Sequence, residues 1–395
     1  MTEYWNISNA NYIRALKSNA YIKLFKLQAL NHYENVMYDI TSKLNDSSKG
    51  SINCNYNQGK RRTCSFSLID NDNLYMPNNE DSLFFKNKKF KISLGIEYQN
   101  ERFWFDEGVF IAKTVDKQDN VVNISGVDKF ALFSNDMNQH KLQQKYVIPA
   151  GSTVGRVIED IITIDMGNGY PTDPIKPIIA PQLYNLAIPY TVEKEQNSTL
   201  GDLLIDLATA VQCDIYYDGQ GYLNLTKVIT DDYLTYAPMW EFSEHQAGYN
   251  SASLSFDYGN CVNAITVKGT DSNAIYSYTA INDYPMSTVR TSLIGFNYGD
   301  IVETPMGYDN QRCKEYAEYL LNKKTILALL TKFNGAFLPH LEENKLISIE
   351  DRKFGFNKER FVVQEFVLPF GASDMTLSVA NINDLPFTKE RRLYE

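Results

Sequence analysis

Adjacent carboxylates are the residues of this 395-residue chain best suited to catalysis. Three acidic pairs are candidates: Glu159/Asp160, Glu342/Glu343 and Glu350/Asp351. A glycosidase needs two carboxyl groups about 5–10 Å apart, so one such pair would serve a cell-wall hydrolase. Each pair has basic or polar neighbours, as ordinary surface acids do, and Asp160 recurs as Asp206 in a repeated segment. We therefore predict a protein that is not an enzyme, with no catalytic residue, and keep a Glu/Asp hydrolase as an alternative.

Nucleophilic or metal-dependent chemistry has little support from spacing. The residues concerned are the histidines His32, His140, His245 and His340 and the cysteines Cys54, Cys64, Cys213, Cys261 and Cys313. The histidines are scattered, and the odd number of cysteines without CxxC spacing indicates reduced packing residues. DNDN at 70–73 resembles the start of a calcium loop, but the glycine of such a loop is absent and Asp81 stands where its closing Glu would be. We therefore interpret this segment as an Asx turn. We predict no metal, no cofactor and no cofactor-binding residue.

Composition and charge exclude several classes of protein. Hydrophobic residues make up 44% and charged residues 22%, an ordinary globular composition. No apolar run approaches the roughly 20 residues that span a bilayer, and the start lacks a signal-peptide pattern, so we expect synthesis in a cytoplasm. The net charge of −10 disfavours tight nucleic-acid binding. The basic stretch KNKKFK at 86–91 is interpreted as a solvated face or edge of a strand, in preference to a phosphate site.

Two short segments repeat one pattern and should form paired helices. STVGRVIEDIIT at 152–163 and STLGDLLIDLAT at 198–209 share Ser, Thr, Gly, Asp and Thr at matching positions. Their apolar residues follow i, i+3, i+4, i+7 spacing, one face of a helix, so Val157 and Ile158 should be buried like Leu203 and Leu204. Thr199 with Asp202 predicts a capping box, and Ser152 or Thr153 can cap the first copy. A packing unit needs such a copy more often than a catalytic motif does.

The elements around these helices define four regions. We predict an N-terminal arm at 1–30, a β-rich domain at 31–140, an α/β inserted module at 141–235 and a second β-rich domain at 236–395. Strands are expected where side chains alternate, as in CSFSLID, and DGQG at 218–221 predicts a hairpin turn. Residues 309–327 should form a helix that begins at Asp309. The fold class is therefore α+β, mainly β.

Several segments together resemble the baseplate or tail-tip hub proteins of tailed phages and related contractile injection systems. The resemblance covers about residues 50–385. It is carried by GKRRTCSFSLID (59–70), GVFIAKTV (108–115), NISGVDKFALF (123–133), YVIPAGSTVGRVIEDII, STLGDLLIDLATAVQCDIYYDGQGYLNL, FLPHLEENKLISIEDRKFGF and FVVQEFVLPFGASDMTLSVANI. Each motif alone is weak, and their order and spacing make the resemblance.

The resemblance implies a structural role. It implies two tail-tube-like β-barrel domains, at 31–140 and 236–395, separated by the inserted module, and a homotrimer that presents six barrels to a six-fold tube. The implied partners are the tail tube and distal tail proteins, the tape-measure protein and tip, spike or receptor-binding proteins, with no sequence-specific nucleic-acid binding and no membrane span. The implied location is the virion tail or baseplate, assembled in the bacterial host cytoplasm. A carbohydrate-binding adhesin with exposed Trp104 or Trp240 remains a further alternative.

Overall fold

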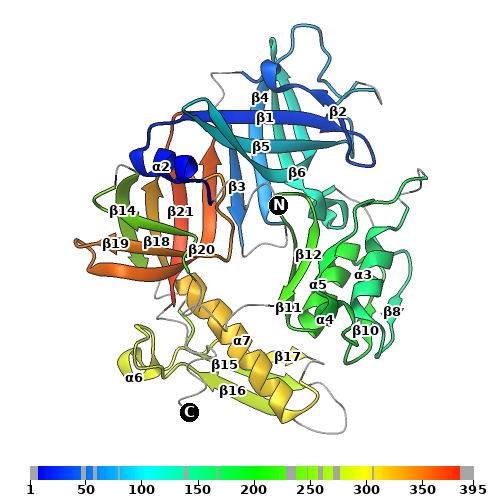
Figure 1. Cartoon of the computed structure of the whole chain (residues 1–395). Coiled ribbons are helices and arrows are strands. Elements are labelled where there is room, and N and C mark those ends of the chain that lie inside the picture. Colours follow the sequence, from blue (N-terminus) through cyan, green and yellow to red (C-terminus); the bar gives the residue numbers. More distant parts are fainter. Residues whose placement is uncertain are drawn as a thin grey trace. The chain divides into compact units, whose positions relative to one another are not determined.

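The computed structural model describes residues 8–45, 50–56, 60–78, 81–137, 141–165, 167, 169–227, 237–246, 248–256, 261–269, 276–304 and 307–382. These residues form an α+β, mainly β fold (Figure 1). The chain divides into two compact units, which are described separately. The first unit contains Met1–Lys227, Ala336–His340 and Phe366–Met375, and the second contains Val228–Gly335, Leu341–Glu365 and Thr376–Glu395.

The first unit is built on an antiparallel sheet. Its strands are β1 (Ile22–Leu30), β2 (Val36–Asp39), β3 (Ser51–Asn55), β4 (Arg62–Ile69), β5 (Lys89–Tyr98), β6 (Glu101–Gln118) and β7 (Val121–Asp128). They lie in the order β3-β4-β7-β6-β5-β1-β2. Along β4, Cys64, Phe66 and Leu68 are buried while the residues between them are more exposed, as the alternating sequence predicts.

The start of the chain corrects one boundary. The helix α2 (Ala10–Ser18) begins at Asn9, whose side chain accepts the N–H of Asn11 at 2.8 Å. β1 then pairs with both β5 and β2. The assignment of residues 22–30 to an arm is therefore wrong. The lysines of IKLFKLQAL obscure the strand pattern, whereas backbone pairing on both sides places the segment inside the sheet.

Aromatic rings fill the interior of the first sheet. Phe90 on β5 lies 5.5 Å from the ring centroids of Phe66 and Phe84, and 5.9 Å from that of Phe110. All four side chains are buried. Edge-to-face and offset contacts of this kind stabilise a core beyond the area they bury.

The inserted module follows β7 within the first unit. Two 3-10 turns, η2 (Lys129–Leu132) and η3 (Asn135–Met137), connect β7 to it. Its own elements are the strands β8 (Tyr146–Ile148), β9 (Ile178–Ile179), β10 (Val192–Lys194), β11 (Cys213–Tyr217) and β12 (Leu223–Lys227), and the helices α3 (Val154–Ile162), α4 (Pro181–Tyr184) and α5 (Leu200–Ala210). β11 and β12 form the predicted antiparallel hairpin. α3 and α5 share one hydrophobic core.

The paired helices confirm the interpretation of the repeat, with two differences. Ile158, Leu203 and Leu204 are fully buried. Thr199 and Asp202 form the predicted capping box of α5. Val157 is only partly buried, and α3 begins at Thr153 without a side-chain capping bond. The second copy therefore has the better-capped start.

A second β-region contains six strands among the described residues. They are β13 (Trp240–Ser243), β14 (Tyr249–Phe256), β18 (Leu329–Gly335), β19 (Leu346–Asp351), β20 (Phe356–Pro369) and β21 (Met375–Asn381). They lie in the order β14-β18-β21-β20-β19-β13. If the strands of each region are numbered along the chain, with the short β2 left out, both regions give the order 2-3-6-5-4-1. The same strand order therefore occurs twice.

The two β-regions also differ. β1 runs antiparallel to β5, whereas its counterpart β13 runs parallel to β19. Between β14 and β18 the second unit carries β15 (Ala264–Gly269), β16 (Ser277–Ile281), α6 (Thr291–Ile294), β17 (Val302–Thr304) and α7 (Asn310–Ala328). α7 confirms the helix predicted after Asp309, whose carboxylate accepts the N–H of Arg312 at 2.7 Å. None of the described helices is long and apolar enough to cross a membrane.

Candidate functional site

The acidic pairs suggested for hydrolysis are engaged in structural contacts. In each pair at least one carboxylate has a partner: Glu159 accepts from the Tyr184 hydroxyl (3.0 Å), Glu342 pairs with Lys345 (3.5 Å), Glu350 accepts from the Ser243 hydroxyl (3.1 Å) and Asp351 accepts from the Tyr249 hydroxyl. Asp206 pairs with Lys194 at 2.9 Å, whereas Asp160 is exposed. Burial, followed by the hydrogen bond to Asp351, raises the pKa of Tyr249. These contacts hold local structure together.

The described histidines have separate surroundings. His340 is buried, its Nδ1 lies 2.6 Å from the Tyr12 hydroxyl, and burial lowers its pKa to about 4. His32 stacks on Tyr170 with ring centroids 4.1 Å apart, and partial burial with the nearby Lys89 and Lys88 lowers its pKa. His245 is exposed on a loop of the second unit. His140 lies outside the described residues.

The cysteines are packing residues, as predicted. All five are free and buried. Burial raises the pKa of the Cys64 thiol and of the Cys313 thiol, which leaves the unreactive protonated form at neutral pH. Within the described ranges, no group of three or more His, Cys, Asp or Glu side chains is arranged to hold a metal ion.

The basic stretch at 86–91 is not a strand edge, and that prediction is wrong. β5 pairs with β1 on one side and β6 on the other. Lys89 is buried and its ammonium lies 2.7 Å from Glu34, while Lys91 pairs with Asp106 at 2.6 Å. Buried lysine needs such a partner, and the acids that supply it are distant in sequence.

The turn at 70–73 follows the Asx-turn interpretation, and of the two candidate tryptophans Trp240 is buried while Trp104 is half-buried. Asp70 accepts the backbone N–H groups of Leu74 (2.8 Å) and Tyr75 (3.3 Å), and it pairs with Lys117 at 3.3 Å. A carboxylate that accepts backbone N–H groups a few residues further along the chain is typical of a turn and not of a metal loop. Trp240 is 9% exposed in β13, and the Lys26 ammonium lies 4.3 Å over the ring of Trp104.

A stacked arginine joins the first sheet to the inserted module. Arg61 precedes β4 and is 5% exposed. Its guanidinium lies 3.8 Å from the ring centroid of Tyr216 on β11 and 4.5 Å from that of Tyr56 after β3. Asp214 on β11 faces the same guanidinium at 3.6 Å and accepts from the Tyr56 hydroxyl at 2.5 Å. A planar guanidinium suits this stacked site better than an ammonium would.

A buried lysine forms a second joint between sheet and module. The Lys129 ammonium is inaccessible and lies 2.7 Å from Glu34 and 3.0 Å from Asp173. The Tyr217 hydroxyl of β11 donates to Asp173 at 2.7 Å. Burial, followed by the charge of Asp173, raises the pKa of Tyr217, so its proton is retained. Buried charges of this kind favour one arrangement, because a displaced partner leaves an uncompensated charge.

A strand irregularity brings Arg62 into the same region. The β5–β6 register shifts between Ile92 and Ser93, and the shift leaves Glu107 without an opposite residue on β5. Glu107 is buried, and its carboxylate lies 3.3 Å from the Arg62 guanidinium. Asp128 accepts the Arg62 backbone N–H at 2.9 Å, and burial raises the pKa of Asp128 to about 6.

The inward position of Arg62 could be predicted from the sequence. Arg62 lies in phase with Cys64, Phe66 and Leu68, so strand alternation alone places its side chain inward. Its partner Glu107 could not be found this way because the irregularity in β6 breaks the alternation. The Glu34 and Asp173 contacts of Lys129 depend on tertiary packing.

The two repeated glycines have packing roles. A side chain at Gly155 would approach the Tyr184 ring to 2.1 Å, and one at Gly201 would approach the Phe133 carbonyl oxygen to 3.0 Å. The Gly201 N–H also donates to that carbonyl at 2.7 Å. The shared glycine of each copy therefore allows close contact at a helix start, which explains why a packing unit repeats it.

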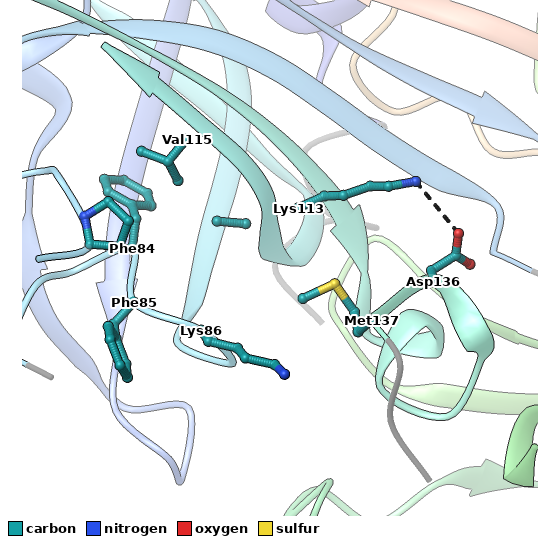
Figure 2. A pocket seen from close by; sticks show the side chains of 9 residues that line it. Phe84, Phe85, Lys86, Lys113, Val115, Asp136 and Met137 are labelled. Atoms are coloured by element: carbon teal, nitrogen blue, oxygen red, sulfur yellow. Dashed lines mark ion pairs between the residues drawn. The ribbon is translucent and has the colours of Figure 1, made fainter. Parts of the chain in front are cut away.

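An open groove of about 450 Å³ lies beside β6 in the first unit (Figure 2). Phe85, Val115 and Met137 supply apolar lining, and Lys86 and Lys113 supply ammonium groups. Lys113 lies 3.5 Å from Asp136, which also pairs with Lys60. The groove has no catalytic arrangement. It combines an apolar surface with excess positive charge.

Comparison with known structures shows the fold of phage tail proteins. The 43 kDa tail protein of prophage MuSo2 from Shewanella oneidensis is 13% identical, with a TM-score of 0.58, and the match covers 91% of this chain and 99% of that one. A tail protein from Neisseria meningitidis MC58 is 11% identical, with a TM-score of 0.59 and the same coverage of 91% and 99%. The mainly β fold and its likeness to phage tail proteins are therefore confirmed, whereas the two β-barrel domains that the resemblance implies stay a prediction.

A chain of the lidded Francisella PdpA-VgrG complex is also similar. It is 12% identical with a TM-score of 0.51, and the match covers 95% of this chain but only 56% of that one. No protein-family model matches the sequence. No curated protein matches it either. At these identities the likeness establishes the fold and leaves the role to be argued from the chain itself.

Proposed function

We propose that this chain is a structural hub at the tip of a phage tail or tail-like particle, and not an enzyme. The observation that carries the proposal is the strand order that occurs twice in one chain. Support comes from the two tail proteins whose folds match this chain over 91% of its length and 99% of theirs. The engaged carboxylates give the hydrolase alternative no comparable support.

The repeated strand order suits a junction between a three-fold ring and a six-fold tube. Three chains with two similar β-regions each present six similar units, which match a six-fold tail tube without a mismatch at the junction. A closed ring also needs heterologous contacts that meet after a fixed rotation. We therefore propose a homotrimer in which both β-regions act as tube-like β-barrel domains.

The regions of the chain then have distinct tasks. The first barrel domain occupies 31–140 together with β1, the second occupies 236–395, and the module at 141–235 is a spacer. Arg61 and Lys129 support the spacer role because their buried contacts hold the module to the first sheet in one arrangement. Residues before β1 are an arm in this scheme.

The partners follow from the position at the tip. The hub joins the tail tube and distal tail proteins to tip, spike or receptor-binding proteins and leaves a channel for DNA and the tape-measure protein. A net charge of −10 suits a conduit that must not grip DNA. The chain would be assembled in the bacterial host cytoplasm and remain in the virion.

Immuno-electron microscopy of intact particles tests this role. An antibody raised against the purified chain should label one end of the tail, opposite the head, and end-on averages of detached tips should show three-fold density. Label on the head, along the tail sides or on no particle would refute the hub role. Peptidoglycan turnover by the purified chain would instead favour the hydrolase.

A further inference from the structure

An exposed apolar surface lies on the second unit, on the segment between β16 and β17. Phe296 and Tyr298 stack on each other with ring centroids 5.3 Å apart and an interplanar angle of 6°. They are 54% and 67% exposed, and Leu293 and Ile301 beside them in sequence are 57% and 56% exposed. The stacked pair forms a contiguous exposed apolar patch, and such patches mark interaction surfaces in soluble proteins.

The aromatic loop (residues 282–301) is held in place by buried asparagines. Asn263 is fully buried, and its side chain donates to the carbonyls of Val289 (3.1 Å) and Gly295 (2.7 Å) and accepts the N–H of Asn297 (2.8 Å). Asn282 is also fully buried and donates to the Ser287 hydroxyl at 2.9 Å. The loop is therefore pre-organised, which lowers the entropy cost of binding.

Charge restricts what this loop can meet. The loop contains two exposed acids, Asp283 and Asp300, and one base, Arg290, so its own charge is −1, and the exposed Glu303 on β17 directly after it brings the local charge to −2. Arg290 is held on the Ser287 carbonyl at 3.0 Å. A partner surface that complements this apolar and acidic loop is therefore apolar and basic.

The groove of Figure 2 has that chemistry. Its ammonium groups, Lys86 and Lys113, and the neighbouring Lys60 outnumber the one acid, Asp136, by two. Lys86 has no ion-pair partner among the residues that the structure describes. With Phe85 and Met137 in its lining, the groove's volume of about 450 Å³ is of the order needed for two aromatic side chains.

We propose that the aromatic loop of one copy of this chain docks in the lysine-lined groove of a second copy. Phe296 and Tyr298 would enter the groove, and Asp300 would approach Lys86 and Lys113. The contact joins two different surfaces, so it is heterologous, and such contacts build rings when the rotation closes. This inference rests on the proposed homotrimer and names the surfaces that hold it.

Cysteine trapping tests the contact directly in the full-length chain. Because the five native cysteines are buried, Lys86→Cys and Phe296→Cys each add one accessible thiol among the described residues. A mixture of the two single variants should form a disulfide-linked dimer under mild oxidation, and neither variant should do so alone. Phe296→Cys mixed with Val147→Cys, at a position 47% exposed in the inserted module, is the matched control.

Charge exchange provides a second readout. Lys113→Glu should weaken self-association measured by sedimentation about tenfold, and Asp300→Lys in the same chain should restore it. Dimers from either single cysteine variant alone, a yield no higher than the control, or no rescue by Asp300→Lys would overturn the contact. A three-fold tip without this cross-link would refute the contact and leave the hub role standing, whereas label away from the tail tip would refute the hub role itself.

Discussion

Acidification should reveal the buried His340 as a destabilising group. His340 is held in the first unit against Tyr12 and Phe105, with its Nδ1 at 2.6 Å from the Tyr12 hydroxyl. Burial lowers its pKa from 6.5 to about 4. The substitution that isolates this effect is His340→Gln, which retains a hydrogen-bonding group for Tyr12 and cannot take up a proton in this range.

The expected magnitude follows from the two pKa values. Well above pH 6.5 the imidazole is neutral in both the folded and the unfolded chain. As the pH falls from 6.5 to 4, the unfolded chain binds a proton that the folded chain does not, so the free energy of unfolding decreases. A pKa lowered from 6.5 to about 4 corresponds to a loss of about 3 kcal/mol, complete near pH 4.

Asp128 acts in the opposite direction over nearly the same range. Burial raises its pKa from 3.8 to about 6, so the folded chain binds this proton first. Lowering the pH from 6 to 3.8 therefore increases the free energy of unfolding from this group. The two effects offset each other in the wild type, and only the comparison with His340→Gln separates them.

Urea unfolding monitored by fluorescence at pH 7, 6, 5 and 4 provides the measurement. The difference in unfolding free energy between His340→Gln and the wild type should move by about 3 kcal/mol in favour of the variant between pH 7 and 4. His245→Gln, at an exposed histidine, is the matched control and should follow the wild-type profile. Parallel profiles for the wild type and His340→Gln would refute the reasoning.

Three further predictions test the module, its joint with the sheet and the absence of catalysis. Leu204→Ala should lower the free energy of unfolding in urea by on the order of 2–5 kcal/mol. Ile205→Ala, at an exposed position of the same helix, should lower it by under about 0.5 kcal/mol. Equal losses for the two variants would contradict the paired-helix core. Arg61→Lys keeps the charge but loses the planar stack on the two tyrosines, so the free energy of unfolding should fall by about 1–2 kcal/mol. An unchanged unfolding midpoint would show that the stack does not stabilise the chain. Single amide substitutions of the candidate acids should leave particle infectivity largely intact. A substitution that abolished infectivity in a normally assembled particle would favour the hydrolase alternative. The acids are Glu159, Asp160, Glu342 and Glu350.

Local chemistry made several elements predictable from the sequence. Thr199 and Asp202 form the capping box because both partners lie within one helical turn. Asp309 caps α7 for the same reason, and Asp70 satisfies its own turn. Strand alternation placed Cys64, Phe66 and Leu68 correctly because the residues on one face of a strand share a period of two.

Long-range pairing was not predictable in the same way. The lysines of 86–91 indicate a solvent-facing strand, yet Lys89 is buried because Glu34, 55 residues earlier, lies against it. In residues 22–30 lysines interrupt the alternation of apolar and polar residues, and the segment is a strand because its backbone pairs with β5 and β2. The ion pairs around Arg62 and Lys129 likewise require partners that only the folded sheet and module bring together.

The differences between the two β-regions bear on which surfaces face which partner. In the proposed ring, a six-fold tube must meet equivalent surfaces, and only the strands that recur in both regions can provide them. β1 and β13 are not equivalent, since one runs antiparallel and the other parallel to its neighbour, and β2 has no counterpart among the described strands. In the part of the chain that the structure describes, the inserted module and the segment from β15 to α7 also occur once each. These unrepeated elements can satisfy only three-fold partners, so the tip-facing side of the ring should be built from them and the tube-facing side from the shared strands.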